Sequence, residues 1–259
     1  KKDEAEDNPG AAARDEAGAC RPRPPLNRRT TPTLYDQRRR PPGAAAIHAR
    51  EPSVNFAELA RERHSVRHYT PGQHISDAEL EAIFADVVLS PSSFNLQPWH
   101  FVVVRDAARK RELRGLAFGQ QQVEDCAAAI VVCGNLQAHA DAPRIYTDAP
   151  APMREKFVPL IGAVYTDQPA LQREEAVRGG SLAAMSLMYA AKARGWDTGP
   201  MIGFDAKKVA TLLALDAQTI PVMLIVLGKA LNGQQPQRLY RRPLSEVVHY
   251  ETLHGRNPA

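Results

Sequence analysis

The sequence predicts a mixed helix-and-strand domain over residues 51–259, preceded by a disordered leader over residues 1–50 that is rich in Pro, Arg and Ala. Three observations carry this. A chain of 259 residues with 44% apolar side chains can bury an ordinary core. Short apolar runs alternate with amphipathic helical patterns from about Ser53 onward, without internal repeats. The first 50 residues contain only four large apolar side chains.

The leader is too polar to fold by itself. It holds 11 basic and 7 acidic side chains, a surplus that equals the whole formal net charge of +4 and leaves the rest of the chain neutral. With so little apolar surface, burial cannot offset the entropy cost of ordering it. The run Arg38–Arg40 could attract RNA or an anionic surface, but the composition favours a solvated tail, so nucleic acid is not an expected partner.

Cysteine usage and hydropathy bound the class of protein further. The three cysteines, Cys20, Cys126 and Cys133, show no C-x-x-C spacing, so neither a disulfide framework nor a structural zinc is expected. The longest apolar stretches, 127–133 and 221–227, are far shorter than the roughly 20 residues that span a bilayer. No apolar secretion segment occurs, and acidic residues in the leader argue against a transit peptide. We therefore expect a cytoplasmic protein without a membrane span.

Capping signals predict the first helices. Asn55 can cap a helix that runs to Arg63. Ser76 and Glu79 have the spacing of a capping box, and the apolar period after them predicts a helix to about Leu89, before Pro91.

The later elements follow from apolar runs and small residues. Residues 101–104, 129–133 and 222–227 are predicted strands, and a helix is expected to begin at Asp205. The pattern from Glu174 to Arg194 predicts a long helix whose many small residues suit either a packed central helix or a subunit interface. The segment 134–172 contains five prolines and little periodicity, which favours a lid or binding loop.

Hydrolytic and metal sites find no support in the motifs. The chain lacks G-x-S-x-G, H-E-x-x-H, a Walker loop and a complete G-x-G-x-x-G, and its histidines have no metal-ligand spacing. What remains is a set of cations and uncharged donors suited to an anionic heterocycle. These groups lie in four segments: 63–67 (RHSVR), 90–99 (SPSSFNLQPW), 198–205 (TGPMIGFD) and the arginines 238, 241 and 242 before Pro243.

Five pieces in this order resemble the FMN-dependent nitroreductase family over nearly all of residues 53–250. They read RHSVR, SPSSFNLQPWHFVVV, GGSLAAMSLMYAAKARGWDTGPMIGFD, PVMLIVLGKA and YRRPL, and the P-S-S-x-N-x-Q-P-W-x-F run is the most specific. The resemblance implies an α+β fold, a three-layer α/β/α sandwich with a mixed, mainly antiparallel central sheet flanked by helices. It also implies a homodimer with FMN at the interface.

The resemblance also assigns site residues. The residues expected to hold the phosphate and ribityl group are Arg63, His64, Ser65 and Arg67, joined by Arg241 and Arg242. The partner chain is expected to line the isoalloxazine with Pro91, Ser92, Ser93 and Asn95. The ring is expected to pack on Pro200, Met201, Ile202 and Gly203, with Gln122 at its pyrimidine edge. Substrate access is assigned to Phe118 and Tyr165.

Two positions depart from some relatives. Ile202 stands where some relatives carry an acidic residue, so the resemblance implies only a backbone contact with the flavin at this position. Gln122 stands where others carry Lys, and an uncharged amide stabilises an anionic reduced flavin less than a cation does.

The implied reaction is a ping-pong oxidoreduction. NAD(P)H passes hydride to FMN N5 and leaves, and a small electrophile such as a nitroaromatic or quinone then binds in its place, with no nucleophile required from the protein. The alternatives are a specialised flavoenzyme on the same fold, with reductive dehalogenation or a flavin-consuming reaction, a non-enzymatic flavin-binding sensor, and a flavin-free interaction module. The sequence does not choose between NADH and NADPH.

Overall fold

A computed structural model describes residues 55–233, 237–256 and 258 of the chain. The predicted leader over residues 1–50 lies outside the described residues. Short 3-10 turns occur at η2 (Ala138–Asp141) and η3 (Leu231–Gly233). The C-terminal segment contains a short helix, α9 (Leu244–Val247).

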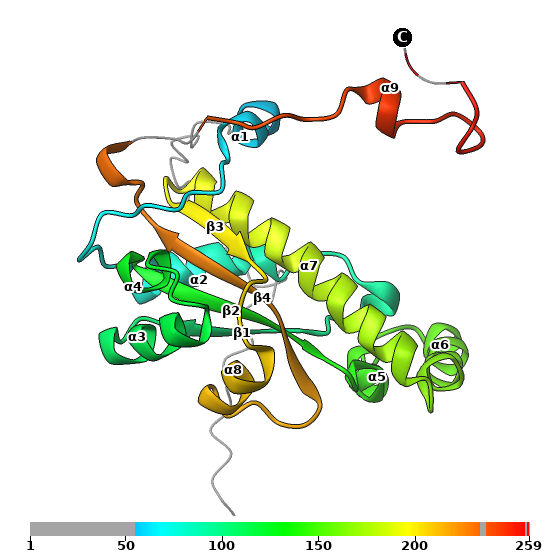
Figure 1. The fold of residues 1–259 in the computed structure, drawn as a ribbon. Helices are drawn as coiled ribbons and strands as arrows, with labels where there is room; N and C mark the ends of the chain where they lie inside the picture. Colours follow the sequence, from blue (N-terminus) through cyan, green and yellow to red (C-terminus); the bar gives the residue numbers. More distant parts are fainter. Residues whose placement is uncertain (1–54, 234–236, 257, 259) are drawn as a thin grey trace, which may run out of the picture. The chain divides into compact units, whose positions relative to one another are not determined.

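Four strands form one antiparallel sheet (Figure 1). They are β1 (Trp99–Val104), β2 (Ala128–Asn135), β3 (Asp197–Met201) and β4 (Thr219–Gly228), in the spatial order β1-β2-β4-β3. Each neighbouring pair is antiparallel. We expected a mixed sheet, but the strand pairs in the described part of the chain are all antiparallel. A parallel pairing occurs there as an isolated bridge between Ser65 and Thr198 of β3.

Helices cover both faces of this sheet. Alternate residues of β2 enter different core clusters: Ile130 and Val132 pack with α2 (Asp77–Val87) and α7 (Pro169–Ala193), whereas Val131 and Cys133 face α3 (Ala107–Leu116) and α8 (Ala206–Leu212). Because both faces are buried, the strand appears in the sequence as a continuous apolar run instead of an alternating one. This arrangement confirms the predicted α+β fold with helices on either side of the sheet.

The predicted helix starts are confirmed in atomic detail. Asn55 accepts a hydrogen bond from Ala57 N at 3.0 Å and so caps α1 (Phe56–Glu62). Ser76 and Glu79 form the reciprocal capping box of α2, with Glu79 N to Ser76 Oγ at 3.2 Å and Ser76 N to Glu79 Oε2 at 3.0 Å. Asp205 caps α8 by accepting a hydrogen bond from Lys208 N at 3.1 Å. By contrast, α3 has no counterpart among the predicted elements.

The prediction of a loop over residues 134–172 is wrong. The segment contains α5 (Ala142–Ile145) and α6 (Ala151–Tyr165), and α7 already begins at Pro169. Three of its prolines occupy the first turn of α5, α6 and α7, where the missing N–H costs no helical hydrogen bond. Only Pro159 lies inside a helix. The prolines therefore mark helix starts.

A second correction concerns residues 198–205, which we expected to be a loop before a helix. Residues 197–201 instead form β3, the edge strand paired with β4. Pro200 lies opposite Ile225 in this pairing. An edge strand tolerates proline because only one of its sides must supply ladder donors.

Helix α7 is the packed central helix that its small residues suggested. A Cβ on Gly134 of β2 would lie 2.7 Å from the carbonyl oxygen of Ala176, so the strand and helix backbones touch there. Part of the helix stays uncovered within the chain, since Val177 and Leu182 are about two-fifths exposed. Among the described helices, none is both long and apolar enough to cross a membrane.

Replacing Gly134 by Ala should lower the free energy of unfolding by about 1–3 kcal/mol, because the added methyl group meets backbone atoms that cannot move without shifting α7. Gly162→Ala in α6 is the matched control. Its Cβ would meet nothing within 4 Å, so this change should be neutral or stabilise by up to about 1 kcal/mol. Urea unfolding of the three proteins measures the difference. Equal stability of the two variants would contradict the close approach of α7.

Candidate functional site

The segment after α1 is extended and docks on the edge of the sheet. Val66 N donates to Thr198 O at 3.0 Å, and Leu231 N donates to His68 O at 2.9 Å. Val66 is buried while Ser65 and Arg67 on either side of it are exposed, as expected for an extended backbone. Two polar side chains of the RHSVR motif therefore point away from the sheet.

Gly199 permits this docking. A Cβ at Gly199 would lie 2.4 Å from Val66 O and 3.1 Å from Tyr69 Oη, so no other residue fits between the segment and β3. Tyr69 donates from its hydroxyl to Val66 O at 3.1 Å. Burial raises the pKa of Tyr69, which keeps this hydroxyl protonated and able to donate.

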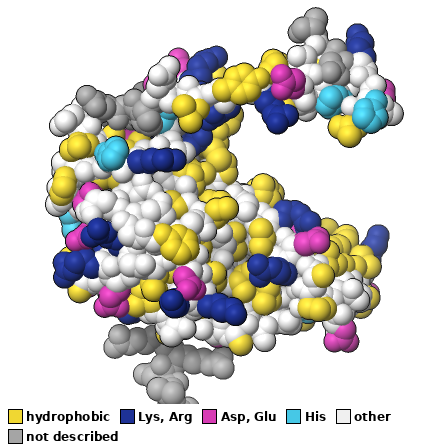
Figure 2. All heavy atoms as spheres, in the orientation of Figure 1, with side chains coloured by type: hydrophobic (Ala, Val, Ile, Leu, Met, Phe, Trp, Pro, Cys, Tyr) yellow, Lys and Arg dark blue, Asp and Glu magenta, His cyan; other side chains and the backbone are white. Residues whose placement is uncertain are grey.

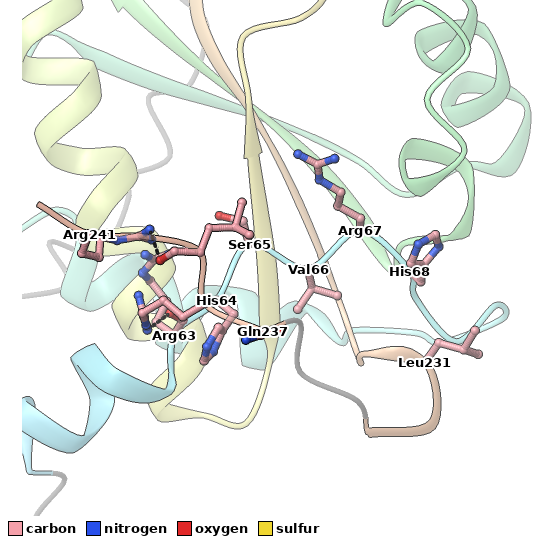
Figure 3. Close-up of a pocket in the computed structure, with 11 residues that line it drawn as sticks. Arg63, His64, Ser65, Val66, Arg67, His68, Leu231, Gln237 and Arg241 are labelled. Atoms are coloured by element: carbon pink, nitrogen blue, oxygen red, sulfur yellow. Dashed lines mark hydrogen bonds between the residues drawn. The ribbon is translucent and has the colours of Figure 1, made fainter.

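A cavity of about 620 Å³ opens above this segment (Figure 3). Among the described residues, its lining contains four arginines and two histidines and no acidic residue, a composition that suits an anion. Figure 3 shows Arg63 and Arg241 together at one end of the cavity and Arg67 and His68 at the other. The lining residues are Arg63, His64, Ser65, Val66, Arg67, His68, Leu231, Gln237, Arg238, Leu239 and Arg241.

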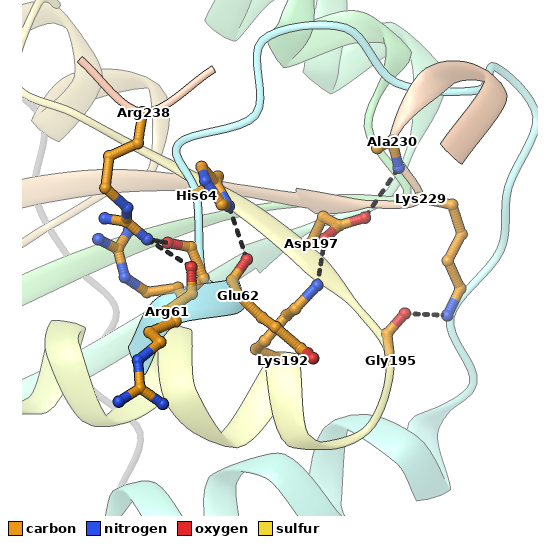
Figure 4. A network of polar contacts seen from close by, with 10 residues as sticks. Arg61, Glu62, His64, Lys192, Gly195, Asp197, Lys229, Ala230 and Arg238 are labelled. Atoms are coloured by element: carbon orange, nitrogen blue, oxygen red, sulfur yellow. Dashed lines mark hydrogen bonds and ion pairs between the residues drawn. The ribbon is translucent and has the colours of Figure 1, made fainter. Parts of the chain in front are cut away.

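Arg238 fastens the C-terminal segment to α1 (Figure 4). Its Nη2 atom donates to the carbonyl oxygens of Ala60, Arg61 and Arg63 at 3.3, 2.6 and 3.0 Å. A cation at the C-terminal end of a helix also meets the negative end of the helix dipole. The contact to the Arg63 carbonyl fixes the backbone from which the Arg63 side chain enters the cavity.

Two buried polar atoms at this site lack a hydrogen-bond partner among the described residues. They are Arg63 Nε and Thr198 Oγ1. Leaving a buried donor unpaired costs about 1–3 kcal/mol, so an acceptor for the Arg63 Nε–H would stabilise this part of the structure.

A second cavity of about 580 Å³ shares residues 65–68 with the first. Its other lining residues are Gln120, Gln121, Gln122, Gly199, Pro200, Met201 and Gly203. Gln122 Nε2 lies 2.8 Å from Met201 Sδ, and Gln120 Nε2 donates to Gly203 O at 2.9 Å. A floor of proline, methionine and glycine with amides along one edge suits a flat heterocycle.

The loop 91–97, between α2 and β1, contributes to neither cavity within one chain. It contains the short 3-10 turn η1 (Ser93–Asn95) and three residues with positive φ: Phe94 (49°), Asn95 (56°) and Gln97 (47°). Each non-glycine residue in this region costs on the order of 1 kcal/mol or more. The loop therefore holds backbone strain in the part of the sequence with the most specific motif.

The predicted site residues thus divide into groups. The first cavity collects Arg63, His64, Ser65, Arg67 and Arg241, and the second collects Gln122, Pro200, Met201 and Gly203. Ile202 and Phe118 line neither and are 78% and 73% exposed. Arg242 is exposed outside both cavities.

Tyr165, which we expected to control substrate access, lines neither of the two cavities. Its side chain is 3% exposed, in a core cluster with Leu96 and Ile161, because α6 turns this end toward the body of the protein. Sequence reasoning also missed Gln120 and Arg238 as anchors. The cluster of arginines near the C-terminus could have pointed to Arg238. Nothing in the sequence distinguishes Gln120 from Gln121 and Gln122.

Protein nucleophiles and metals find little support in the geometry. Burial raises the pKa of the Cys126 thiol to about 11 and that of Cys133 to about 12, so neither is a thiolate near neutral pH. Within the described ranges, no group of three or more His, Cys, Asp or Glu side chains is placed to hold a metal ion.

Comparison with known proteins gives the family. The model of the nitroreductase family matches residues 60–229. The chain belongs to the nitroreductase family. Among its relatives is MhqN of Bacillus subtilis, whose name describes an NAD(P)H nitroreductase; it is 37% identical over 76% of this chain and 99% of its own length. The CLA biosynthesis enone reductase of Lactiplantibacillus plantarum is 31% identical over 70% of this chain and 88% of its own length.

Solved structures of the nitroreductase family share the fold. The crystal structure of ydfN from Bacillus subtilis superposes with a TM-score of 0.73 and 37% identity, covering 75% of this chain and 98% of that one. A structure from Exiguobacterium sibiricum, described as a nitroreductase in complex with FMN, gives a TM-score of 0.71 and 31% identity over 78% of this chain and 99% of that one.

Substituting Arg238 by Gln should loosen the end of α1. Hydrogen bonds from this exposed donor contribute about 1 kcal/mol, so backbone amides of residues 59–65 should exchange hydrogen about threefold to tenfold faster in mass-spectrometric measurements. Arg111→Gln on the exposed face of α3 removes the same charge and should leave this exchange unchanged. Identical exchange in all three proteins would contradict the anchoring role of Arg238.

Proposed function

We propose that the protein is an FMN-dependent NAD(P)H oxidoreductase of the nitroreductase type, with FMN bound along the two cavities that meet at residues 65–68. The observation that carries the proposal is a cationic cavity beside a second cavity with a floor of proline, methionine and glycine. Among the described residues, the first cavity has no acidic lining residue and Arg63 Nε has no hydrogen-bond partner. The phosphate of one FMN suits the cationic cavity, and its ring suits the second cavity. The family membership and the FMN complex of the Exiguobacterium sibiricum relative support the same assignment.

The residues of this chain would do the binding and positioning. Arg63, Arg67 and Arg241 supply the donors for a phosphate, and Ser65 adds a hydroxyl for the ribityl chain. Gln122 would present an amide to the polar edge of the ring, and Pro200, Met201 and Gly203 would form the surface on which the ring packs. Gln120 holds this surface through the Gly203 carbonyl.

Bound FMN would supply the hydride chemistry between NAD(P)H and an electrophile. The chain need not provide a nucleophile, which agrees with the protonated, buried cysteines. Its task is to orient both partners and to limit access of water. Two exposed apolar side chains are near Gly203: Ile202 precedes it in the chain, and Phe118 Cδ2 would lie 4.0 Å from a Cβ built on it. They favour apolar acceptors such as nitroaromatics, quinones or enones.

We also propose that the working unit is a homodimer in which the loop 91–97 of one chain completes the flavin site of the other. Large apolar side chains remain exposed on α7 and along the C-terminal segment, and Figure 2 shows apolar groups at the surface of both. Leu239, Tyr240 and Leu253 are 72–80% exposed. Surface of this kind is typical of a region that another chain covers.

An anaerobic visible spectrum tests the proposed function. After reconstitution with FMN, the protein should show the oxidised-flavin bands, and NADH or NADPH should bleach them at rates that identify the preferred donor. Adding a quinone or nitroaromatic should then restore the bands. Flavin that stays oxidised with both nucleotides would redirect the assignment to a specialised flavoenzyme or a flavin-binding sensor. A protein that takes up no FMN would exclude all flavin-based functions.

A further inference from the structure

Two tyrosines from the helical segment after β2 hydrogen-bond to the loop 91–97. Tyr165, the last residue of α6, has its hydroxyl 3.0 Å from Ser93 Oγ. Tyr146, which follows α5, donates to Phe94 O at 3.1 Å. Both contacts join segments that are 52 or more residues apart in the chain.

The bonds from Tyr146 and Tyr165 are the long-range hydrogen bonds of the loop 91–97. Its other bonds are internal: Gln97 N to Ser92 Oγ at 2.9 Å, Leu96 N to Ser93 O at 2.9 Å, Asn95 N to Ser92 O at 3.1 Å and Gln97 Nε2 to Asn95 O at 3.2 Å. Within the part of the chain that the structure describes, only the two tyrosine hydroxyls link residues 91–97 to another element by hydrogen bonds.

Packing ties the loop to the same helices. Leu96 is 4% exposed in a cluster with α5 and α6 that is separate from the two clusters on the faces of the sheet. The Phe94 ring lies 6.2 Å from that of Phe157 and 6.3 Å, edge-on, from that of Tyr165. The loop and the α5–α6 pair therefore form one packed unit beside the main core.

The loop needs such support because of its backbone. Phe94, Asn95 and Gln97 all hold positive φ, and residues in this region persist only where surrounding contacts over-determine them. We propose that Tyr146 and Tyr165 are positioning residues that hold the loop 91–97 in its flavin-binding shape. The inference rests on the proposed function, because it assumes that this loop meets the flavin of the partner chain.

The environment of Tyr165 suits this role. Its ring is stacked against that of His139 at 5.8 Å, and the Gln172 amide donates to its backbone carbonyl at 2.8 Å. Burial raises the pKa of Tyr165 and lowers that of His139. Both groups are therefore uncharged near neutral pH, and the Tyr165 and Ser93 hydroxyls share a hydrogen bond in which either can be the donor.

The test is the dissociation constant of FMN, measured by fluorescence quenching of the full-length protein at 20 °C. Tyr146→Phe and Tyr165→Phe each keep the ring and remove one hydroxyl. Each should weaken FMN binding about twofold to tenfold, the effect of one hydrogen bond, and the double variant should weaken it further. Ser186→Ala is the control, since it removes a hydroxyl that bonds Ser90 and not residues 91–97. It should bind FMN as the wild type does.

A double-mutant cycle separates positioning from general stability. If Tyr165 acts through Ser93, then Tyr165→Phe should add nothing to the FMN dissociation constant of Ser93→Ala. Melting temperatures of the apoproteins show whether each variant is folded at 20 °C, and the two tyrosines give independent variants should one fail to fold. Full additivity in the cycle, or FMN affinities within the error of the wild type, would overturn the positioning role. A wild-type protein that binds no FMN would instead overturn the proposed function.

Discussion

The approach of residues 63–70 to the edge strand β3 is the constraint on which the site depends. Gly199 leaves the space for it, and the hydrogen bonds of Val66 and Tyr69 hold it. Once the segment lies there, Arg63 and Arg67 stand over one cavity and the backbone of β3 forms the wall of the next. In the part of the chain that the structure describes, Arg63 Nε and Thr198 Oγ1 have no hydrogen-bond partner. The fold therefore concentrates cationic donors where a phosphate would satisfy them.

The strained loop 91–97 is the second half of this arrangement. Positive φ at three non-glycine residues is unfavourable in an unfolded or loosely held chain, so the loop keeps its shape only against the helices α5 and α6. Those helices belong to a satellite cluster and not to the clusters that hold the sheet. A change in that cluster can alter the loop without unfolding the core, which offers a route for tuning the site independently of stability.

How much of this could be predicted depended on whether the signal was local. Capping residues such as Asn55 and Ser76 act within one turn, and buried strands appear as apolar runs, so these elements were predictable. β3 was missed because an edge strand with Gly199 and Pro200 has the composition of a loop. The helices between residues 134 and 172 were missed because prolines that begin helices resemble prolines that break them.

The site residues likewise divide into those with a local sequence signal and those whose position depends on the tertiary fold. Arg63 and Arg67 were identifiable from the family motif and line the same cavity, whereas the burial of Tyr165 and the anchoring by Arg238 depend on packing between distant segments. Side-chain exposure at the end of a helix cannot be predicted from sequence when the helix itself is missed.

Complementation between two defective chains tests the central claim most directly, namely that one flavin is held by the cations of one chain and the loop of another. One chain would carry Arg63→Gln with Arg67→Gln, the other Ser93→Ala with Asn95→Ala, each with a different purification tag. A heterodimer purified through both tags should bind about one FMN per dimer, because one of its two sites is then intact. Failure to obtain the heterodimer, or FMN binding no better than in the two parent variants, would contradict the account.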